Sequence, residues 1–219
     1  MKFSLEELIN HTEQSFKNSD NNISKLNQEI LNLEGYSGNK TRHFYNNICS
    51  LNNANYLEIG TWRGSSFISA IYKNNINAVA VDNWEEFGGP KTEFVSNVSQ
   101  LSPESNYSFI EKDCFKITDS DFPESVKEFD IYLYDGCHTY ECHKEAVTYF
   151  HKFLSKYFIL IVDDWRDDHD WGKVVKGTRD GINESEIIIH KYYERESYHD
   201  RTGREDYWNG IGVFICEKK

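Results

Sequence analysis

The stretch Phe129-Asp-Ile-Tyr-Leu-Tyr-Asp-Gly-Cys-His-Thr-Tyr-Glu141 decides the fold of this chain. Residues Ile131–Tyr134 are apolar and β-forming, which predicts a buried parallel strand. Asp135 falls where that strand ends, a glycine then permits a tight turn, and Thr139 is a good N-cap for a helix. His138 therefore shares one strand tip with an acid. Ligands bind at the carboxyl ends of strands in open α/β sheets, so this tip is a candidate site, although the same residues also suit a plain turn or a helix cap.

On both sides of this strand, short apolar runs alternate with helical segments, a pattern typical of a parallel α/β sheet. The six other predicted strands lie near Tyr56–Ile59, Ala78–Val81, Ser108–Glu111, Tyr157–Val162, Glu186–His190 and Gly210–Cys216. The predicted helices lie near Ser65–Tyr72, Lys91–Gln100, Thr139–Leu154 and Lys173–Asp180, with a short one at Pro123–Lys127. No clear helix separates the last two strands, so we expect them to pair antiparallel at one edge of the sheet.

Three amphipathic helices are expected ahead of the sheet. The first begins at a capping box, Ser4–Glu7, and the second carries an apolar stripe over Ile23–Leu33. Thr41 can cap the third helix. Arg42 and His43 follow it and could reach a ligand, but we expect them to be solvated, as polar residues at helix ends usually are.

Length and composition predict one domain with a helical preface. Residues 1–53 should form an N-terminal helical extension, serving as a lid or an oligomer contact, and residues 54–219 a single α/β domain. With 219 residues, 38% of them hydrophobic, the chain can bury one good core. The net charge of −12 argues against a nucleic-acid or anionic-membrane partner and favours a small neutral or cationic ligand. The N-terminus lacks the apolar core of a signal peptide and no apolar run reaches membrane length, so we expect a cytoplasmic protein, and a homo-oligomer is compatible with it.

The five cysteines are an odd number and contain no C-x-x-C pair or zinc-like spacing. We therefore interpret them as reduced and mostly structural. Cys137 falls inside the candidate site, but it has no obvious activating partner other than His138, and we do not expect it to act as a nucleophile.

A glycine-rich loop, Gly60-Thr-Trp-Arg-Gly64, follows the first strand and leads into a helix with serines in its first turn. Backbone N–H groups of such a loop and the dipole of the helix favour an anionic group. A third glycine is absent, so this is not the dinucleotide fingerprint, and a carboxylate is favoured over a pyrophosphate. Asp82 closes the second strand, where ribose hydroxyls are often held, and Asp113 closes the third, where it could accept from the amino group of a base. Together these residues describe a nucleoside-bearing ligand.

The order of elements and these motifs resemble class I S-adenosylmethionine-dependent methyltransferases. The resemblance implies a Rossmann-like α/β sheet of seven strands, parallel except for one antiparallel strand near the edge. It also implies S-adenosyl-L-methionine as the cofactor, with Asp82 at the ribose, Asp113 at the adenine, and Glu58, Gly60 and Ser66 at the amino-acid end. The other residues expected to line the cofactor site are Thr61, Gly64, Ser65 and Asp135.

Two adjacent acids, Asp163 and Asp164, end the fifth apolar run, beside the strand that ends in Asp135. Three converging carboxylates would repel one another, so a hard divalent cation, Mg²⁺ first, is the economical explanation, and these three residues are its predicted ligands. Asp-x-x-His followed by Asp-Asp resembles the metal-dependent macrocin and mycinamicin type of sugar O-methyltransferase. Catechol O-methyltransferase is similar in placement, with a lysine where His138 stands. The alternative reading is a solvated turn, because the charged run continues to Asp170.

The chemistry of O-methylation explains this set of residues. A neutral hydroxyl is a weak nucleophile, and a cation held beside it lowers its pKa while a base, His138, removes the proton. We therefore expect a Mg²⁺-dependent O-methyltransferase acting on a small hydroxylated molecule, with a glycosyl group ahead of a catechol. Three further histidines, His143, His151 and His169, are expected on the surface.

Two other functions stay open. A metal-dependent hydroxylase of the cephalosporin hydroxylase type could hold iron at Asp135, His138 and a paired Asp, although the cofactor loop argues against it. A non-catalytic nucleoside-binding protein of the same fold would not need the intact acids. Acceptor recognition is expected from the helical extension, the loop Trp84–Pro90 and the segment Tyr192–Trp208, whose aromatic residues also suit a dimer interface.

Overall fold

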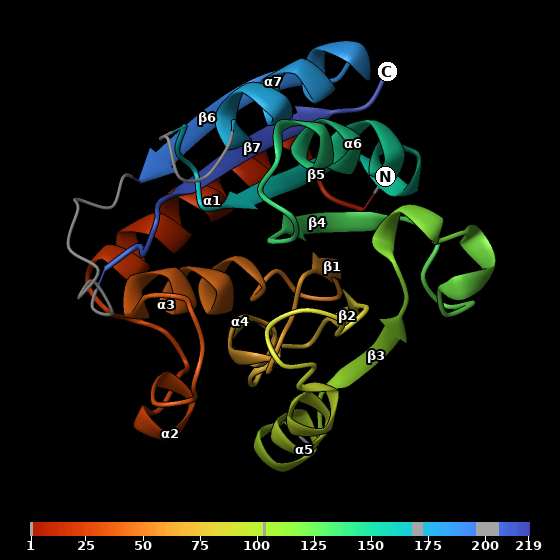
Figure 1. Cartoon of the computed structure of the whole chain (residues 1–219). Helices are drawn as coiled ribbons and strands as arrows, with labels where there is room; N and C mark the ends of the chain where they lie inside the picture. The colour runs from red at the N-terminus through yellow and green to blue at the C-terminus, as the bar shows by residue number, and fades with distance from the viewer. Residues whose placement is uncertain (1, 103, 168–172, 196–205) are drawn as a thin grey trace.

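The computed structural model describes residues 2–102, 104–167, 173–195 and 206–219 and contains one seven-stranded sheet (Figure 1). The strands lie in the order β3 (Asn106–Glu111), β2 (Asn77–Asp82), β1 (Asn55–Ile59), β4 (Phe129–Tyr134), β5 (Leu154–Asp163), β7 (Ile211–Glu217) and β6 (Ile188–Arg195). β7 is antiparallel to both of its neighbours, and the pairings from β3 through to β5 are parallel. The predicted sheet, parallel except for one strand near the edge, is confirmed.

Helices cover both faces of the sheet, because alternate residues of each buried strand point to opposite sides. In β1 and β4, Tyr56 and Ile131 belong to the core beneath α1 (Leu5–Asp20), α3 (Asn39–Ile48), α4 (Ser65–Ile71) and α5 (Lys91–Leu101). Their neighbours Leu57 and Tyr132 belong to the core beneath α6 (Tyr140–Phe150) and α7 (Val174–Glu184). Figure 1 shows α6 and α7 on one side of the sheet and α3, α4 and α5 on the other.

Several predicted boundaries are corrected. The predicted helix at Pro123–Lys127 is absent, and short 3₁₀ turns occur earlier instead, η1 (Cys114–Lys116) and η2 (Asp119–Asp121). The helix after the candidate site ends at Phe150, passes into η3 (His151–Phe153), and β5 then begins at Leu154. β6 begins later than predicted and extends to Arg195, because it pairs with β7 along that whole length.

The N-terminal extension contains one long helix, one short one and one of intermediate length. The capping box is confirmed: Ser4 Oγ accepts from the Glu7 N–H at 3.2 Å, and Glu7 Oε2 accepts from the Ser4 N–H at 2.8 Å. The second helix is only α2 (Gln28–Leu31), because Asn27 caps it at its side-chain oxygen and so sets a late start. α3 begins after Gly38, so the prediction that Thr41 caps it is wrong.

Arg42 and His43 are buried, contrary to the expectation that they are solvated. The Arg42 guanidinium donates to the carbonyl oxygens of Ile30, Leu31 and Leu33. These carbonyls lie at the end of α2 and beyond it, where a helix leaves acceptors unsatisfied, so the arginine holds the short helix against α3.

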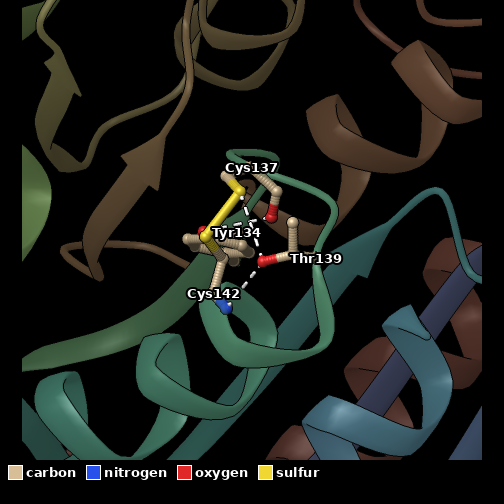
Figure 2. The surroundings of a disulfide bond; sticks show 4 residues. All are labelled: Tyr134, Cys137, Thr139 and Cys142. Atoms are coloured by element: carbon tan, nitrogen blue, oxygen red, sulfur yellow. Dashed lines mark hydrogen bonds between the residues drawn. A yellow bond between two sulfur atoms is a disulfide. The ribbon is translucent and has the colours of Figure 1, made fainter. Parts of the chain in front are cut away.

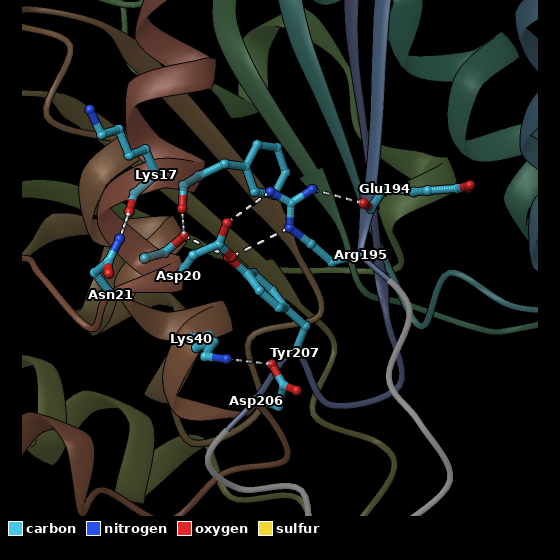
Figure 3. A network of polar contacts seen from close by, with 10 residues as sticks. Lys17, Asp20, Asn21, Lys40, Glu194, Arg195, Asp206 and Tyr207 are labelled. Atoms are coloured by element: carbon cyan, nitrogen blue, oxygen red, sulfur yellow. Dashed lines mark hydrogen bonds and ion pairs between the residues drawn. The ribbon is translucent and has the colours of Figure 1, made fainter.

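The end of α1 is bonded to the C-terminal part of the chain (Figure 3). Asp20 accepts from the Arg195 guanidinium at 2.9 Å and from the Tyr207 hydroxyl at 2.8 Å, and Arg195 lies over the Phe16 ring. Burial acts to raise the pKa of the Asp20 carboxyl, but the bonds from Arg195 and Tyr207 outweigh it and lower that pKa. None of the helices in the described part of the chain is long and apolar enough to cross a membrane.

Candidate functional site

The tips of β4 and β5 bring two acids and an imidazole together. Asp135 follows β4, Asp164 follows β5, and His138 lies on the turn between β4 and α6. One ligand atom from each of these residues lies within 4.8 Å of the other two. His138 Nε2 is 2.6 Å from Asp164 Oδ2. Two of the three predicted metal ligands and the predicted base therefore share one site.

Asp163, the third predicted ligand, is engaged elsewhere. Its Oδ1 accepts from the Tyr45 hydroxyl at 2.8 Å, and both side chains are buried. Tyr45 belongs to α3, so the N-terminal extension reaches the acidic tips. Nothing in the sequence singled out Tyr45, since its partner lies 118 residues away.

The acids of this site are held in an unfavourable environment. Burial raises the pKa of Asp135 well above its usual range, and the carboxylates of Asp163 and Asp164 raise it further. Burial and then Asp164 raise the pKa of Asp163, although the Tyr45 hydroxyl bond lowers it in part. Asp164 also adopts a φ of +51°, which is uncommon for a residue with a side chain. Repulsion and backbone strain in one place favour a site that binds positive charge.

Glu58 lies beneath the glycine-rich loop and is fully buried. Its Oε1 accepts from the Ser66 hydroxyl at 2.6 Å and its Oε2 from the Tyr56 hydroxyl at 2.5 Å. Burial raises the pKa of Glu58 to about 7, while both hydroxyl bonds oppose the rise. The structure thus places two predicted cofactor residues, Glu58 and Ser66, in contact with each other.

The glycine-rich loop adjoins the acidic tips. Gly60 has a φ of +87°, and a Cβ there would lie 1.9 Å from the carbonyl oxygen of Asp135, so only glycine fits. Asp82 holds the loop: its Oδ2 accepts from the N–H groups of Thr61 and Trp62, and its Oδ1 from that of Trp84. A carboxylate has about four acceptor positions, and these three bonds occupy three of them; the predicted role of Asp82 at the ribose stays a prediction.

The remaining loop residues are placed as follows. The Thr61 hydroxyl is buried and has no hydrogen-bond partner among the residues that the structure describes. Gly64, with a φ of +88°, precedes α4, and no side chain caps that helix. Ser65 is buried against Gly35 of the extension. A buried hydroxyl of this kind can bond a water molecule or a ligand.

Asp113 lies apart from this group. It caps η1, where its Oδ1 accepts from the Phe115 N–H at 3.1 Å and its Oδ2 pairs with Lys116 at 3.0 Å. The Lys116 ammonium lowers the pKa of the Asp113 carboxyl. Its predicted role at the adenine stays a prediction.

A disulfide bond joins Cys137 to Cys142 (Figure 2). The interpretation that all five cysteines are reduced is therefore wrong for this pair, whereas Cys49, Cys114 and Cys216 are free. The C-x₄-C spacing around His138 was the signal, but spacing alone does not bring two sulfur atoms together. The turn from β4 into α6 does so.

His143 was expected on the exposed face of α6 and is buried instead. Burial lowers its pKa to about 3, so the imidazole is neutral. It packs edge-on against the Tyr134 ring, with centroids 4.9 Å apart, beneath the turn that carries His138. His169 lies outside the described residues.

The sheet order, the single antiparallel strand and the site at the strand tips define the class I methyltransferase fold. Residues 57–165 match a protein family described as a methyltransferase domain. This part of the chain is therefore a methyltransferase domain, and the resemblance to class I S-adenosylmethionine-dependent methyltransferases is confirmed. No curated protein matches the chain.

Solved structures of similar fold have low sequence identity to this chain. A putative O-methyltransferase from Klebsiella pneumoniae is similar with a TM-score of 0.60 at 13% identity, covering 94% of this chain and 89% of that one. An O-methyltransferase from Bacillus cereus in complex with SAH is similar with a TM-score of 0.59 at 14% identity, covering 95% of this chain and 99% of that one. A putative RNA methyltransferase from Pyrococcus horikoshii is similar with a TM-score of 0.57 at 7% identity, covering 94% of this chain and 97% of that one. These likenesses show the fold and leave the methyl acceptor open.

Proposed function

We propose that this protein transfers the methyl group of S-adenosylmethionine to a hydroxyl oxygen of a small molecule, with the help of a divalent cation. The observation that carries the proposal is the grouping of Asp135, His138 and Asp164 within 4.8 Å at the strand tips, directly beside the glycine-rich loop. A base, two carboxylates and a cofactor loop in one place suit activation of an oxygen nucleophile.

The chemistry of the donor set supports a cation. Asp135 and Asp164 offer hard oxygen ligands, and Mg²⁺ in proteins commonly takes one or two carboxylates, with water and substrate filling its other positions. The cation would neutralise the repulsion that raises the pKa of Asp135 and would lower the pKa of a substrate hydroxyl. The group contains one histidine, whereas non-haem iron oxygenases use two histidines and one carboxylate, so an oxygen-preferring cation is favoured over the hydroxylase alternative.

The loop residues suit the methyl donor. S-adenosylmethionine supplies an activated methyl group. The unpaired hydroxyl of Thr61 is available to the ligand, and Asp82 keeps one acceptor position for a ribose hydroxyl while it orders the loop. A similar structure, from Bacillus cereus, is named as an O-methyltransferase in complex with SAH, which supports the same ligand here.

His138 is the proposed base. It belongs to a turn that the Thr139 cap and the start of α6 position, and its Nε2 already lies at hydrogen-bonding distance from a carboxylate, Asp164, that can orient it. Its task is to take the proton of the acceptor hydroxyl. For the acceptor itself we propose a sugar, or next a catechol, because vicinal hydroxyls can share one cation, and the net charge of −12 disfavours nucleic acid.

Titration calorimetry tests the proposal in parts. Wild-type protein should bind S-adenosylmethionine and, separately, Mg²⁺, and Asp164→Asn should lose Mg²⁺ binding while it keeps the donor. If the protein does not bind S-adenosylmethionine, the proposal of methyl transfer is wrong. If it binds S-adenosylmethionine but no cation, only the cation dependence in the proposal is wrong. If His138→Ala and His138→Gln both kept near-wild-type turnover at neutral pH, the base would be another group. Product formed only with oxygen and a 2-oxo acid would favour the hydroxylase.

A further inference from the structure

The turn that carries His138 is closed by a covalent ring (Figure 2). Cys137 immediately precedes His138, Cys142 lies in the first turn of α6, and the disulfide holds their Cα atoms 5.8 Å apart. The ring includes His138 and Thr139, the N-cap of the helix. A bond that thiols can open therefore fixes the backbone on both sides of the proposed base.

We propose that Cys137 and Cys142 form a thiol–disulfide exchange site, whose oxidised state positions His138 and whose reduction by a dithiol loosens the site. The positioning part of this inference rests on the proposed function, because it takes His138 to be the acting base. The exchange part rests only on the disulfide bond and on the exposure of the two cysteine residues.

Accessibility directs exchange to this pair. Cys137 is exposed and Cys142 is half-buried, whereas Cys49 and Cys216 are buried. Cys114 is a free, half-buried thiol whose pKa burial raises to about 12, so it stays protonated and unreactive. A dissolved dithiol therefore reaches Cys137 first among the cysteines of the chain.

The chemistry of reduction balances with a dithiol as the only co-reactant. One thiolate of the dithiol attacks Cys137 Sγ, the disulfide breaks, and Cys142 leaves as a thiolate that takes a proton from solvent. The start of α6 favours negative charge at Cys142, which makes it the better leaving group. The second thiol of the dithiol then attacks the mixed disulfide and releases Cys137. Two electrons pass to the protein, and the dithiol becomes a disulfide.

Once the ring opens, weaker contacts remain at the turn. The Tyr134 hydroxyl donates to the Cys137 carbonyl at 3.4 Å, and Thr139 Oγ1 accepts from the Cys142 N–H at 3.2 Å. His138 Nε2 has Asp164 at 2.6 Å, but a cation would compete for that same carboxylate. The covalent ring is thus the strongest of the described constraints on this turn for which a cation would not compete, and outer contacts of this kind tune the site that they support.

The test uses the whole wild-type chain in its oxidised form, treated with dithiothreitol and then reoxidised with glutathione disulfide. Hydrogen–deuterium exchange of the peptide spanning 136–142 should rise on reduction and fall again on reoxidation. Binding of Mn²⁺, measured by electron paramagnetic resonance, should weaken about tenfold in the reduced form, the usual scale for lost outer-shell support. The double variant Cys137→Ser, Cys142→Ser should behave as reduced protein and ignore dithiothreitol, while Cys114→Ser should keep the wild-type response.

Three results separate the possibilities. If both cysteines are alkylated in native protein before any reductant is added, there is no exchange site and the inference is overturned. If reduction frees both thiols but leaves amide exchange unchanged, the ring does not position the turn. If oxidised protein binds no Mn²⁺, the cation in the proposed function is wrong, and the amide-exchange result alone decides this inference.

Discussion

Replacing Asp135 by Asn tests the electrostatic origin of the site. In the metal-free protein this carboxyl has a pKa raised by burial and by the neighbouring carboxylates of Asp163 and Asp164, so its ionised form is disfavoured in the folded state. Asn has nearly the same shape and carries no charge. The variant should therefore be more stable than wild type without metal at neutral pH, although it loses a predicted ligand.

The geometry sets the magnitude. The ligand atoms of Asp135 and Asp164 lie within 4.8 Å, and two unit charges at that separation repel by about 3 kcal/mol at an effective dielectric constant of about 20. Asp135 is only partly buried, so solvent screens part of this repulsion, and we expect a gain of about 1–3 kcal/mol in the free energy of unfolding, or roughly 5 °C in Tm. Because the pKa of Asp135 is raised in the folded wild type, its protonated carboxyl contributes fully to stability below the ordinary pKa of 3.8, and this contribution is lost as pH rises. The advantage of the variant should therefore vanish near pH 4 and grow toward pH 8.

The assay is thermal and urea unfolding at several pH values, with chelator or with Mg²⁺ at about a hundred times its Kd. Saturating Mg²⁺ should stabilise wild type by about 3 kcal/mol and the variant by almost nothing. Asp113→Asn is the matched control: this acid follows another strand, its pKa is lowered by Lys116, and its loss should cost under about 1 kcal/mol and leave the Mg²⁺ response intact. The reasoning fails if Asp135→Asn is the less stable protein without metal at pH 8, or if Mg²⁺ stabilises both proteins equally.

Three further outcomes are expected. Burial raises the pKa of Glu58 from 4.5 to about 7, so its protonated carboxyl contributes to stability below pH 4.5, and this contribution is lost as pH rises through 7. Glu58→Gln should therefore flatten the dependence of the unfolding free energy on pH by about 3 kcal/mol over that window, measured by urea titrations. Tyr45→Phe leaves a buried acceptor on Asp163 unpaired and should cost about 1–3 kcal/mol in the same assay, and a cost near zero would mean that the bond is not formed in solution. Removing the ring between Cys137 and Cys142, which spans five residue steps, should lower the unfolding free energy by about 2 kcal/mol, measured by calorimetry against reduced wild type, which should match the variant.

The strand that leads into Asp135 was predicted correctly from its local sequence pattern. Ile131–Tyr134, an apolar run that ends in Asp135 and a glycine, carries its strand and its turn in its own residues, and the structure has them there. The second helix shows the opposite, because its apolar stripe predicts a long helix over Ile23–Leu33. The segment before Asn27 is instead bonded to α3: the Lys25 N–H donates to Asn46 Oδ1, and Ser24 Oγ is hydrogen-bonded to His43 Nδ1, which holds the segment in an irregular path. Hydrophobic periodicity indicates which residues prefer burial. It does not indicate whether a residue far away in the sequence will hydrogen-bond to the backbone of the same segment and so prevent a helix.

By itself, the sequence determined the alternation of strands and helices, the glycine-rich loop and the acids at the strand ends, because each depends on residues that are close together in the chain. Only the tertiary structure decided that Tyr45 reaches Asp163, that Arg42 and His143 are buried, and that Cys137 is bonded to Cys142. Those outcomes depend on which surfaces meet when the sheet is assembled. Desolvation and pairing across long sequence separations are properties of that assembly and of no single segment.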